Sequence, residues 1–328
     1  MQVDFVIPWV DGSDPEWLKL RNRYSTSDDC THDCRFRDWG ILKYWFRAVE
    51  TYAPWVNRIF FVTSGQIPGW LNTDHPKLRI ISHKDYIPAE YLPTFSSHTI
   101  ELNLHRIADL SEHFVYFNDD MFLNAPVKES DFFHNGLPKD IAVLSAFAPY
   151  SSNCSYTHAI CNVMSFLNRN FDKHKIIANN PELWFSPLYG RKILNNIYYS
   201  PTKFFSNLLN AHIPSSMLKS TFVKLWDMEP ELLHNTCMNK FRGPYDVNQY
   251  IMSYYNICCG MFYPRNIHFG KCYSIGQKQD EMYEDILSGR HQTICINDHP
   301  NVTDYIREQE AISTIFQQKL PIKSSYEL

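Results

Sequence analysis

The chain has 328 residues, of which 44% are hydrophobic and 15% aromatic, and its 31 basic residues nearly balance 35 acidic ones. A chain of this length and composition buries enough apolar surface to fold without stabilising cross-links. Its aromatic content argues against a disordered protein. The formal net charge of −4 argues against broad, non-specific nucleic-acid binding, so no nucleic acid is expected among the partners.

The sequence carries no recognisable targeting or membrane-spanning segment. The N-terminal run lacks a basic region and is interrupted by Asp4 and Pro8, so we expect no signal peptide. No stretch approaches the ~18 uncharged apolar residues of a membrane-spanning helix. Nine cysteines, an odd number without secretory context, indicate reduced thiols and a cytoplasmic protein.

Strands and helices alternate over the first part of the chain. Apolar runs and amphipathic periodicity predict strands at 3–10, 58–63, 78–82 and 113–118 and helices at 39–52 and about 97–109. The turn residues from Asp11 to Pro15 are expected to open a further helix. This alternation is typical of a parallel α/β sheet, in which ligands bind beyond the carboxyl ends of the strands.

The second half of the sequence has a different pattern. It predicts a strand at 141–148, a mostly helical region from 158 to 257, a strand at 292–296 and a terminal helix at 303–318. There is no repeat and no obvious linker. We therefore expect this half to pack on the first half and not to form an independent domain.

Several common enzyme motifs are absent. The 11 glycines form neither a GxGxxG nor a Walker A loop, and the sequence has no HExxH or GxSxG. The sequence therefore lacks the main motif that would indicate a nicotinamide dehydrogenase, a P-loop kinase, a zincin or an α/β-hydrolase.

The strongest local signal is a pair of adjacent carboxylates, Asp119 and Asp120, which follow Asn118 at the end of an apolar strand. Carboxylate oxygens suit Mg²⁺ or Mn²⁺, which keep several waters and bind substrate phosphates. Many sugar-nucleotide transferases hold a metal–diphosphate with a similar short acidic motif. The alternative is a solvated turn after a strand.

A second candidate group lies on the predicted helix at 97–109. His98, Glu101 and His105 fall within about 60° of one helix face, and Arg106 is adjacent. Neighbouring apolar residues indicate that the helix is partly buried, which favours a binding stripe, and a solvated polar face is the alternative.

Two further groups suit a nucleotide. Trp9 and Asp11, which precede Asp14, could stack and hydrogen-bond a nucleoside, although a core tryptophan beside an Asx turn is the plainer interpretation. Arg35 and Arg37 near a helix start could bind phosphate, and a surface ion pair is the alternative.

The remaining candidates are weaker. His212, Arg242 and Asp246 are unremarkable individually, because a lone histidine is more often structural than catalytic. The cluster Cys30, His32, Asp33 and Cys34 lacks a partner pair at zinc-site spacing, so zinc is not expected there.

Together these residues make the chain resemble the Stealth family, which includes bacterial capsular-polysaccharide phosphotransferases and the catalytic subunit of the lysosomal-enzyme GlcNAc-1-phosphotransferase. The matching blocks are IPWVDGSDP at 7–15; RFRD at 35–38, YAPWV at 52–56, TSGQIPGWL at 63–71 and NDDMF at 118–122; AHIP at 211–214 with Arg242; and ICIND at 294–298 with Phe316 and KSSYE at 323–327. The resemblance covers nearly the whole chain, although no motif matches between about 150 and 205. The large insertions of the animal enzyme are absent, which points to the compact bacterial type.

The resemblance implies a fold and an activity. The expected fold is α/β, a Rossmann-like, GT-A-related, mainly parallel sheet with a large helical addition. One Stealth-type catalytic domain would span 1–328, with a nucleotide-sugar core at 1–150, a helical region at 151–260 and a C-terminal part at 261–328 that returns to the core. The expected reaction transfers hexose 1-phosphate or its N-acetyl form from a UDP-sugar to a polysaccharide hydroxyl, forming a phosphodiester and releasing UMP.

The resemblance also implies roles for particular residues. The expected catalytic residues are Glu101, Asp120, His212 and Arg242; the expected substrate-binding residues are Trp9, Asp11, Asp14, Arg35, Arg37, His98, Arg106, Asn118 and Asp246; and the expected ligands of Mg²⁺ or Mn²⁺ are Asp119, Asp120, Asn297 and Asp298. Either His212, with its near-neutral titration, or Asp120 would be the base, and metal binding by Asp120 would favour His212.

The identities of the substrates stay open at this point. The donor would be UDP-GlcNAc, UDP-GalNAc, UDP-Gal or UDP-Glc, and the acceptor a surface or capsular glycan, free or lipid-linked. A lipid-linked acceptor would place the protein in the cytoplasm, peripherally at the inner face of the membrane. The alternatives are a metal-dependent GT-A-type glycosyltransferase that releases UDP and a non-catalytic carbohydrate-binding protein.

Overall fold

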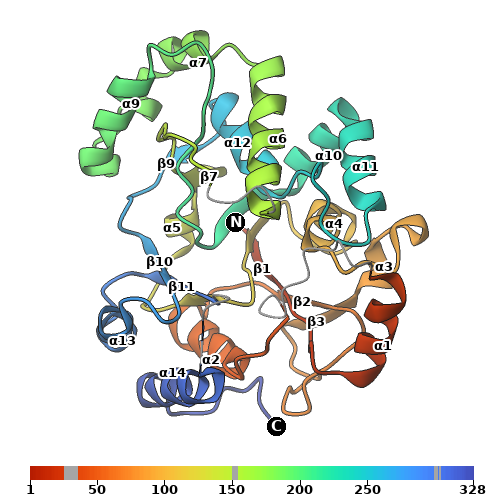
Figure 1. Cartoon of the computed structure of the whole chain (residues 1–328). Helices are drawn as coiled ribbons and strands as arrows, with labels where there is room; N and C mark the ends of the chain where they lie inside the picture. The colour runs from red at the N-terminus through yellow and green to blue at the C-terminus, as the bar shows by residue number, and fades with distance from the viewer. Residues whose placement is uncertain (26–35, 150–153, 299–301, 303) are drawn as a thin grey trace.

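The computed structural model describes residues 1–25, 36–149, 154–298, 302 and 304–328, and its centre is a five-stranded sheet (Figure 1). The strands lie in the order β3-β2-β1-β4-β8, with bounds Leu78–Ser82, Ile59–Thr63, Val3–Pro8, His113–Tyr116 and Ser215–Leu218. The first four are parallel, and β8 is antiparallel to β4. The expected α/β fold with a mainly parallel, Rossmann-like sheet is confirmed.

The strand order reverses at β1. The chain proceeds from β1 to β2 and β3 on one side and then returns to place β4 on the other side. In open α/β sheets a ligand crevice forms at such a switch point, outside the carboxyl ends of the strands. The segments that leave β1 and β4, which carry Asp11 and the Asp119–Asp120 pair, therefore face the same edge.

Both faces of this sheet are covered, which explains the nearly continuous apolar runs of its strands. Phe5 and Phe61 belong to one core, which includes α2 (Leu42–Tyr52). Val6 and Phe60, their immediate neighbours in sequence, belong to the other. Successive side chains of a strand point to opposite faces, so one run supplies both cores.

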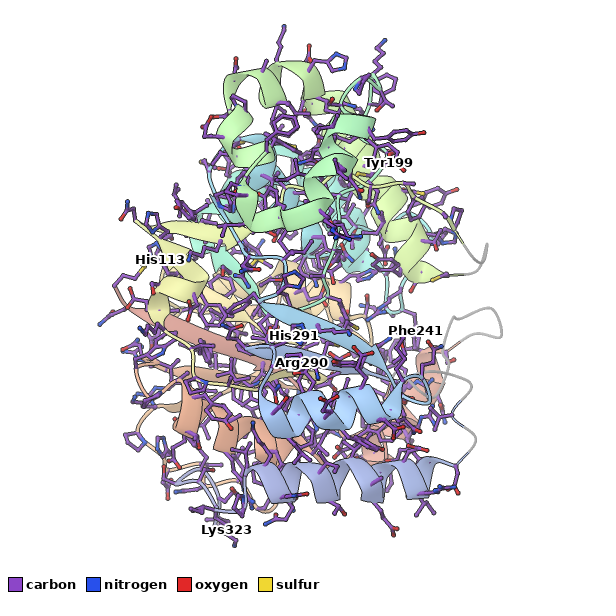
Figure 2. The ribbon with its side chains drawn as sticks, turned by 90° about the vertical axis from the view of Figure 1, so that its left-hand side faces the viewer. His113, Tyr199, Phe241, Arg290, His291 and Lys323 are labelled. Carbon is purple, nitrogen blue, oxygen red and sulfur yellow. The ribbon has the colours of Figure 1, made fainter. Side chains whose placement is uncertain are left out.

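The first core also holds a second sheet, in the order β10-β11-β5, and the two helices α13 and α14. Figure 2 shows these helices at one end of the molecule, far from the helical region that carries Tyr199. Their bounds are Gly270–Ser274 for β10, Thr293–Asn297 for β11, Met121–Leu123 for β5, Gln279–Ser288 for α13 and Tyr305–Lys319 for α14. The predicted strand at 292–296 and terminal helix are confirmed.

The second core is covered mainly by helices. These are α4 (Ser97–Leu102), α6 (Ser155–Asn170), α7 (Lys173–Asn179), α8 (Pro181–Trp184), α9 (Ile193–Tyr199), α10 (Lys219–Met228), α11 (Pro230–Met238) and α12 (Tyr250–Cys258). The remaining elements are α1 (Pro15–Tyr24), α3 (His83–Tyr86), α5 (Glu129–Phe132), β6 (Phe133–His134), β7 (Leu137–Asp140), β9 (Tyr263–Pro264) and the 3₁₀ turns at Ala89–Tyr91, Leu104–Arg106 and Pro187–Lys192. Among the described residues, none of the helices combines the length and apolar character needed to cross a bilayer.

The strand expected at 141–148 is wrong. The N–H groups of Ala142 and Leu144 donate to side chains, to the Tyr189 hydroxyl at 3.1 Å and to Asn196 Oδ1 at 2.6 Å. Residues 141–144 are buried, and side chains satisfy two of the backbone N–H groups that a neighbouring strand would otherwise satisfy. An isolated antiparallel bridge joins Leu144 to Leu208, where Ser145 N donates to Asn207 O at 3.0 Å and Leu209 N donates to Val143 O at 2.7 Å.

Two other expectations need correction. The helix predicted at 97–109 stops at Leu102, because the chain turns at Asn103, whose side-chain amide donates to Thr99 O at 2.8 Å, and continues as a 3₁₀ turn. The region from 158 to 257 is mostly helical as predicted, but it also contains β8, a four-residue strand too short to interrupt the helical pattern.

A buried ion pair ties the C-terminal segment to α2. Arg47 Nε and Nη2 donate to the two carboxylate oxygens of Glu327 at 2.7 and 2.8 Å, and both side chains are almost fully buried. Burial raises the pKa of Glu327, but hydrogen bonds from Arg47 and Ser324 outweigh it and hold the pKa below its usual value.

We predict that Arg47→Met lowers the free energy of unfolding by about 3–5 kcal/mol, because Glu327 then stays buried without its partner. Arg23, exposed in the last turn of α1, is the matched control, and Arg23→Met is expected to change stability by no more than about 0.5 kcal/mol. Denaturant unfolding of both variants measures the difference, and equal losses would show that the pair contributes nothing specific.

Candidate functional site

The turn from Asn118 to Met121 lies between the two sheets, because β4 precedes it and β5 follows it. Met121 N donates to Asn118 O at 3.1 Å and closes the turn, and Ile296 N of β11 donates to Asp120 O at 2.8 Å. The backbone of Asp120 is therefore held by the second sheet while Asn118 continues from the first.

His212 faces Asp120 from the segment before β8. Its Nε2 lies 3.8 Å from Asp120 Oδ2, and its Nδ1 lies 2.8 Å from the hydroxyl oxygen of Tyr250. The backbone of His212 adopts a left-handed conformation, with φ of 47°, and its N–H donates to Asn210 Oδ1 at 2.7 Å. Burial lowers the pKa of His212, but the hydrogen bond and negative charge of Asp120 outweigh it and raise the pKa above its usual value.

Cys295 completes a cluster with these two residues. One ligand atom from each of Asp120, His212 and Cys295 lies within 4.8 Å of the others. Cys295 is fully buried in β11, directly opposite Cys272 of β10. It is the only group of three or more His, Cys, Asp or Glu side chains with metal-site spacing in the described part of the chain.

Asp119 points into a different charge environment. Enclosure by the protein, followed by repulsion from Asp120 and Asp38, raises the pKa of Asp119 to about 7, although the side chain keeps contact with solvent. Burial and the charge of Asp11 likewise raise the pKa of Asp38. The edge of the sheet thus gathers carboxylates from three segments, and Arg242 is the cation that acts on Asp119.

Glu101 and His98 are both on α4, and both side chains are buried. The Tyr116 hydroxyl donates to Glu101 Oε1 at 3.2 Å, and the charge of Glu101 acts on His212. His98 Nδ1 lies 3.2 Å from Asp246 Oδ2, and burial lowers the pKa of His98 although the hydrogen bond with Asp246 opposes this. Arg242 is held by the Ser97 hydroxyl, to which its Nη2 donates at 2.7 Å. The structure therefore brings helix α4 and the Arg242–Asp246 loop together.

Several residues predicted to bind substrate have structural partners. Trp9 is buried and stacks on Phe61, with ring centroids 5.8 Å apart, and Asp14 caps α1 by accepting from two backbone N–H groups. Arg106 lies over the Trp226 ring, with its guanidinium carbon 4.9 Å from the centroid. His105 is no longer on the face shared by His98 and Glu101, because the helix ends before it. Its ring contacts those of Trp226 and Phe222.

The predicted residues of the last block pair with the arginine motif. Arg37 Nε and Nη2 contact the Asp298 carboxylate at 2.9 and 3.2 Å, and Asn297 ends β11. Asp11 Oδ1 accepts from the N–H and hydroxyl of Ser13 at 2.8 and 2.6 Å, an Asx turn. Arg35 and the cluster from Cys30 to Cys34 lie outside the described residues.

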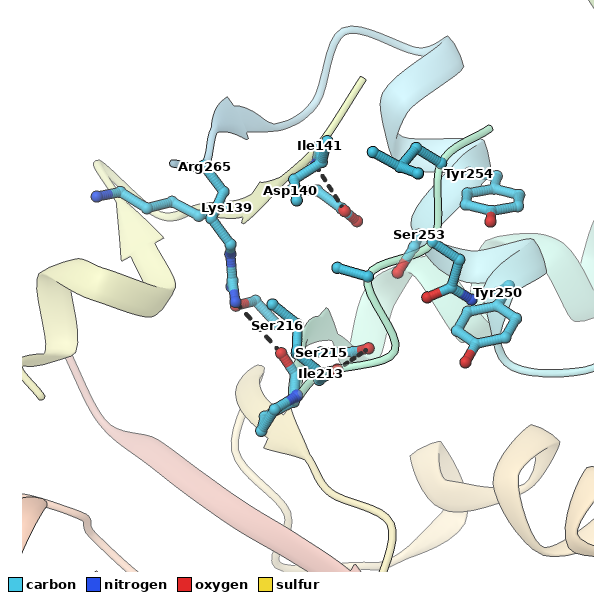
Figure 3. Close-up of a pocket in the computed structure, with 14 residues that line it drawn as sticks. Lys139, Asp140, Ile141, Ile213, Ser215, Ser216, Tyr250, Ser253, Tyr254 and Arg265 are labelled. Carbon is cyan, nitrogen blue, oxygen red and sulfur yellow. Dashed lines mark hydrogen bonds between the residues drawn. The ribbon is translucent and has the colours of Figure 1, made fainter. Parts of the chain in front are cut away.

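A polar pocket adjoins the His212 segment (Figure 3). Ala211 and Ile213, on either side of His212, line it together with Tyr250, and the buried Arg265 donates to Ser216 Oγ at 2.7 Å. Burial lowers the pKa of Arg265 to about 10. Tyr250 thus links His212 to a pocket lined by hydroxyl, amide and charged groups.

Sequence reasoning missed Tyr250, Cys295 and Asp38 as members of the site. Asp38 had a usable signal, because it directly follows the arginine motif that was singled out. Tyr250 had none, since nothing in its sequence surroundings indicates contact with a residue 38 positions away. Cys295 lies within the matched block at 294–298, but the sequence indicates only a reduced thiol there.

Comparison with known proteins places the chain among relatives of similar length. Residues 1–29 match the family model for Stealth protein conserved region 1, and residues 35–140 match conserved region 2. The capsular polysaccharide phosphotransferase WcwK of Streptococcus pneumoniae is 41% identical over 99% of this chain and 98% of its own. The exopolysaccharide phosphotransferase cps2G of Lactiplantibacillus plantarum is also 41% identical, over 99% and 96%, and the receptor polysaccharide phosphotransferase WefC of Streptococcus gordonii is 38% identical over 100% and 99%.

Solved structures give weaker likenesses. The galactosyltransferase LgtC in complex with donor and acceptor sugar analogs aligns at 11% identity over 98% of both chains, with a TM-score of 0.38. Since that score is low, the strand order itself carries the description of the fold. With relatives near 40% identity along its whole length and matches to both conserved-region models, the chain belongs to the Stealth family.

Proposed function

We propose that the protein transfers a sugar 1-phosphate from a UDP-sugar to a hydroxyl of a surface polysaccharide and releases UMP. The observation that carries this proposal is the His212–Asp120 pair, oriented by Tyr250, at the strand edge where α/β sheets bind nucleotide-type ligands. The phosphotransferase names of the relatives, which specify capsular, exopolysaccharide and receptor polysaccharide, support the same reaction.

In this reaction the acceptor oxygen attacks the β-phosphorus of the UDP-sugar. A new oxygen–phosphorus bond forms, the bond from the β-phosphorus to the bridging oxygen breaks, and UMP leaves with that oxygen. His212 Nε2 takes the proton of the acceptor hydroxyl, and the adjacent Asp120 stabilises the imidazolium that forms. Tyr250 fixes the ring orientation through Nδ1.

Phosphoryl transfer depends on positioning and on neutralising the charge of the diphosphate. Arg242, held by Ser97, supplies a planar guanidinium that can contact two phosphate oxygens, which lysine cannot copy. Glu101 is buried, accepts a hydrogen bond from the Tyr116 hydroxyl and acts on His212 through its charge.

A divalent cation fits the Asp119 side of the turn. Burial, and after it repulsion from Asp120 and Asp38, raise the pKa of Asp119, and a cation would relieve the repulsion. Mg²⁺ or Mn²⁺ binds through one or two carboxylates together with substrate phosphates. We assign Asp119 as the main protein ligand, with Asp120 and Asp38 nearby, while Asp298 is engaged by Arg37 and Asn297 belongs to β11. When bound, the cation would offset the charge of the diphosphate.

The remaining proposals concern the substrates. We propose a UDP-hexose or UDP-N-acetylhexosamine donor, with Asp11 near the nucleoside, Asn118 on the same turn as the carboxylates, and the pocket beside Tyr250 open to the acceptor. We further propose a lipid-linked acceptor at the inner face of the membrane. Support comes from the surface around α9, which exposes apolar side chains beside basic ones: Leu194, Ile197, Tyr198 and Phe204 beside Arg191, Lys192 and Lys203.

We predict that His212→Ala and Arg242→Ala each lower turnover by about a hundredfold or more, because one removes the base and the other the phosphate clamp. His174→Ala, at an exposed position on the helical region, and Arg23→Ala, at an exposed position on α1, are the matched controls and should keep normal turnover. Initial rates and circular dichroism are measured for all four. Near-normal turnover of a folded His212 or Arg242 variant would remove that residue from the site.

The identity of the released nucleotide tests the reaction itself. We predict that the protein, incubated with Mg²⁺, a panel of UDP-sugars and a surface-glycan acceptor, releases UMP and leaves a phosphodiester in the glycan. Chromatography identifies the nucleotide, and ³¹P NMR identifies the linkage. Release of UDP would instead make the protein a glycosyltransferase, and glycan binding independent of any UDP-sugar would support a binding protein.

Sedimentation with vesicles tests the membrane proposal. Wild-type protein is expected to bind vesicles that contain anionic lipid, and the double variant Ile197→Asp/Tyr198→Asp is expected to bind at least about tenfold more weakly, because it loses two apolar contacts. Val223→Asp, at an exposed position on α10, is the control and should bind normally. Equal binding by the two variants would exclude the α9 surface as the contact.

A further inference from the structure

We propose that Asp120, His212 and Cys295 form a binding site for a thiophilic divalent cation of the Zn²⁺ class, separate from the Mg²⁺ proposed at Asp119. We also propose that occupation of this site inhibits the enzyme, a consequence that rests on the function proposed above. No feature of the sugar-phosphate transfer requires a thiol at this position.

The spacing of the three side chains suits such an ion. Zn²⁺ binds nitrogen and oxygen at about 2.0 Å and sulfur at about 2.3 Å in a tetrahedron, which places ligand atoms roughly 3.5 Å apart. His212 Nε2 and Asp120 Oδ2 are already 3.8 Å apart, and all three ligand atoms lie within 4.8 Å of one another. Shifts of about an ångström in side-chain position would complete the geometry.

The types of donor atom in this cluster indicate which metal it would bind. One carboxylate, one imidazole and one thiol form a mixed set that favours Zn²⁺ over Mg²⁺, which prefers oxygen donors in an octahedron. A hard cation at Asp119 and a softer one at Asp120 would therefore occupy different sides of the same turn.

The surroundings of the cluster are those of a prepared metal site. The Tyr250 hydroxyl engages His212 Nδ1, which leaves Nε2 facing the cluster, the arrangement of a metal-bound histidine with an outer partner. Asp120 Oδ1 is buried and has no hydrogen-bond partner among the described residues. An acceptor oxygen in that state is available to a cation.

Cys272 lies next to this cluster but is not one of the three side chains whose ligand atoms have metal-site spacing. It lies directly opposite Cys295 on the neighbouring parallel strand, and the two thiols interact with each other. The charges of Asp120 and His212 also act on the pKa of Cys272. Being only partly buried, it gives the ion a route from solvent to the buried thiol of Cys295.

Binding would stop the transfer for a simple reason. The cation would take the lone pair of His212 Nε2, with which the imidazole accepts the acceptor proton, and would neutralise Asp120. The same two groups cannot serve the acceptor hydroxyl and the cation together.

Cobalt titration tests the site without relying on activity. Co²⁺ replaces Zn²⁺ in tetrahedral sites, and thiolate ligation gives a charge-transfer absorption band. With thiols kept reduced, the wild-type chain is expected to show this band, to lose it when Zn²⁺ is added, and to keep it in excess Mg²⁺. Cys161→Ser, at an exposed thiol on α6, should behave like wild type, and Cys295→Ser should lose the band.

Two further variants protect the test against misfolding of Cys295→Ser. Cys272→Ser and His212→Gln change partly exposed side chains and should each weaken Co²⁺ binding by about tenfold or more. Absence of the band in wild type, or its persistence in Cys295→Ser, would overturn the proposal.

Zn²⁺ should also block nucleotide release until a chelator removes it. If no UDP-sugar is turned over, the reaction proposal fails while the cobalt spectra still decide the metal site.

Discussion

The position of Asp120 depends on two strand pairings that meet at one turn. The antiparallel register of β4 with β8 sets Tyr116 opposite Ser215, so His212, three residues earlier, comes beside the turn after β4. The antiparallel register of β5 with β11 sets Met121 opposite Cys295, so that thiol comes beside the same turn from the other sheet. Neither sheet alone assembles the site. A one-residue slip in either pairing would turn its residue to the opposite face.

The parallel core could be predicted because burial on both faces leaves a direct trace in sequence. The run from Ile59 to Thr63 is buried throughout and nearly all apolar, and β1 follows the same pattern. The run at 141–148 is also largely apolar, yet it forms no strand: only residues 141–144 are buried, and Tyr189 and Asn196 accept hydrogen bonds from the backbone N–H groups of Ala142 and Leu144. The apolar composition of a segment indicates that it packs in the core. Its secondary structure depends on which groups form hydrogen bonds with its backbone N–H and C=O groups.

The site could be predicted only in part, for a related reason. Adjacent carboxylates at the end of a strand are a local signal, so Asp119 and Asp120 were accessible to reasoning from the residues. His212 and Arg242 entered through family resemblance, because their importance comes from contacts with Asp120 and Ser97, more than 90 positions away. Trp9 illustrates the alternative given for it from the sequence, because it is buried and stacks on Phe61 in the core.

The two adjacent carboxylates do not have the same surroundings, and this difference organises the chemistry. The backbone carbonyl of Asp120 is bound by Ile296, and its side chain meets an imidazole and a thiol. Asp119 meets other carboxylates and Arg242, so its charge is the one that a hard cation would relieve. In the proposed reaction, this difference would separate the handling of the diphosphate charge from the handling of the acceptor proton. A residue that moves the proton would have to stay free of the metal that neutralises the leaving group, and the same separation would leave Asp120 available to the softer ion proposed above.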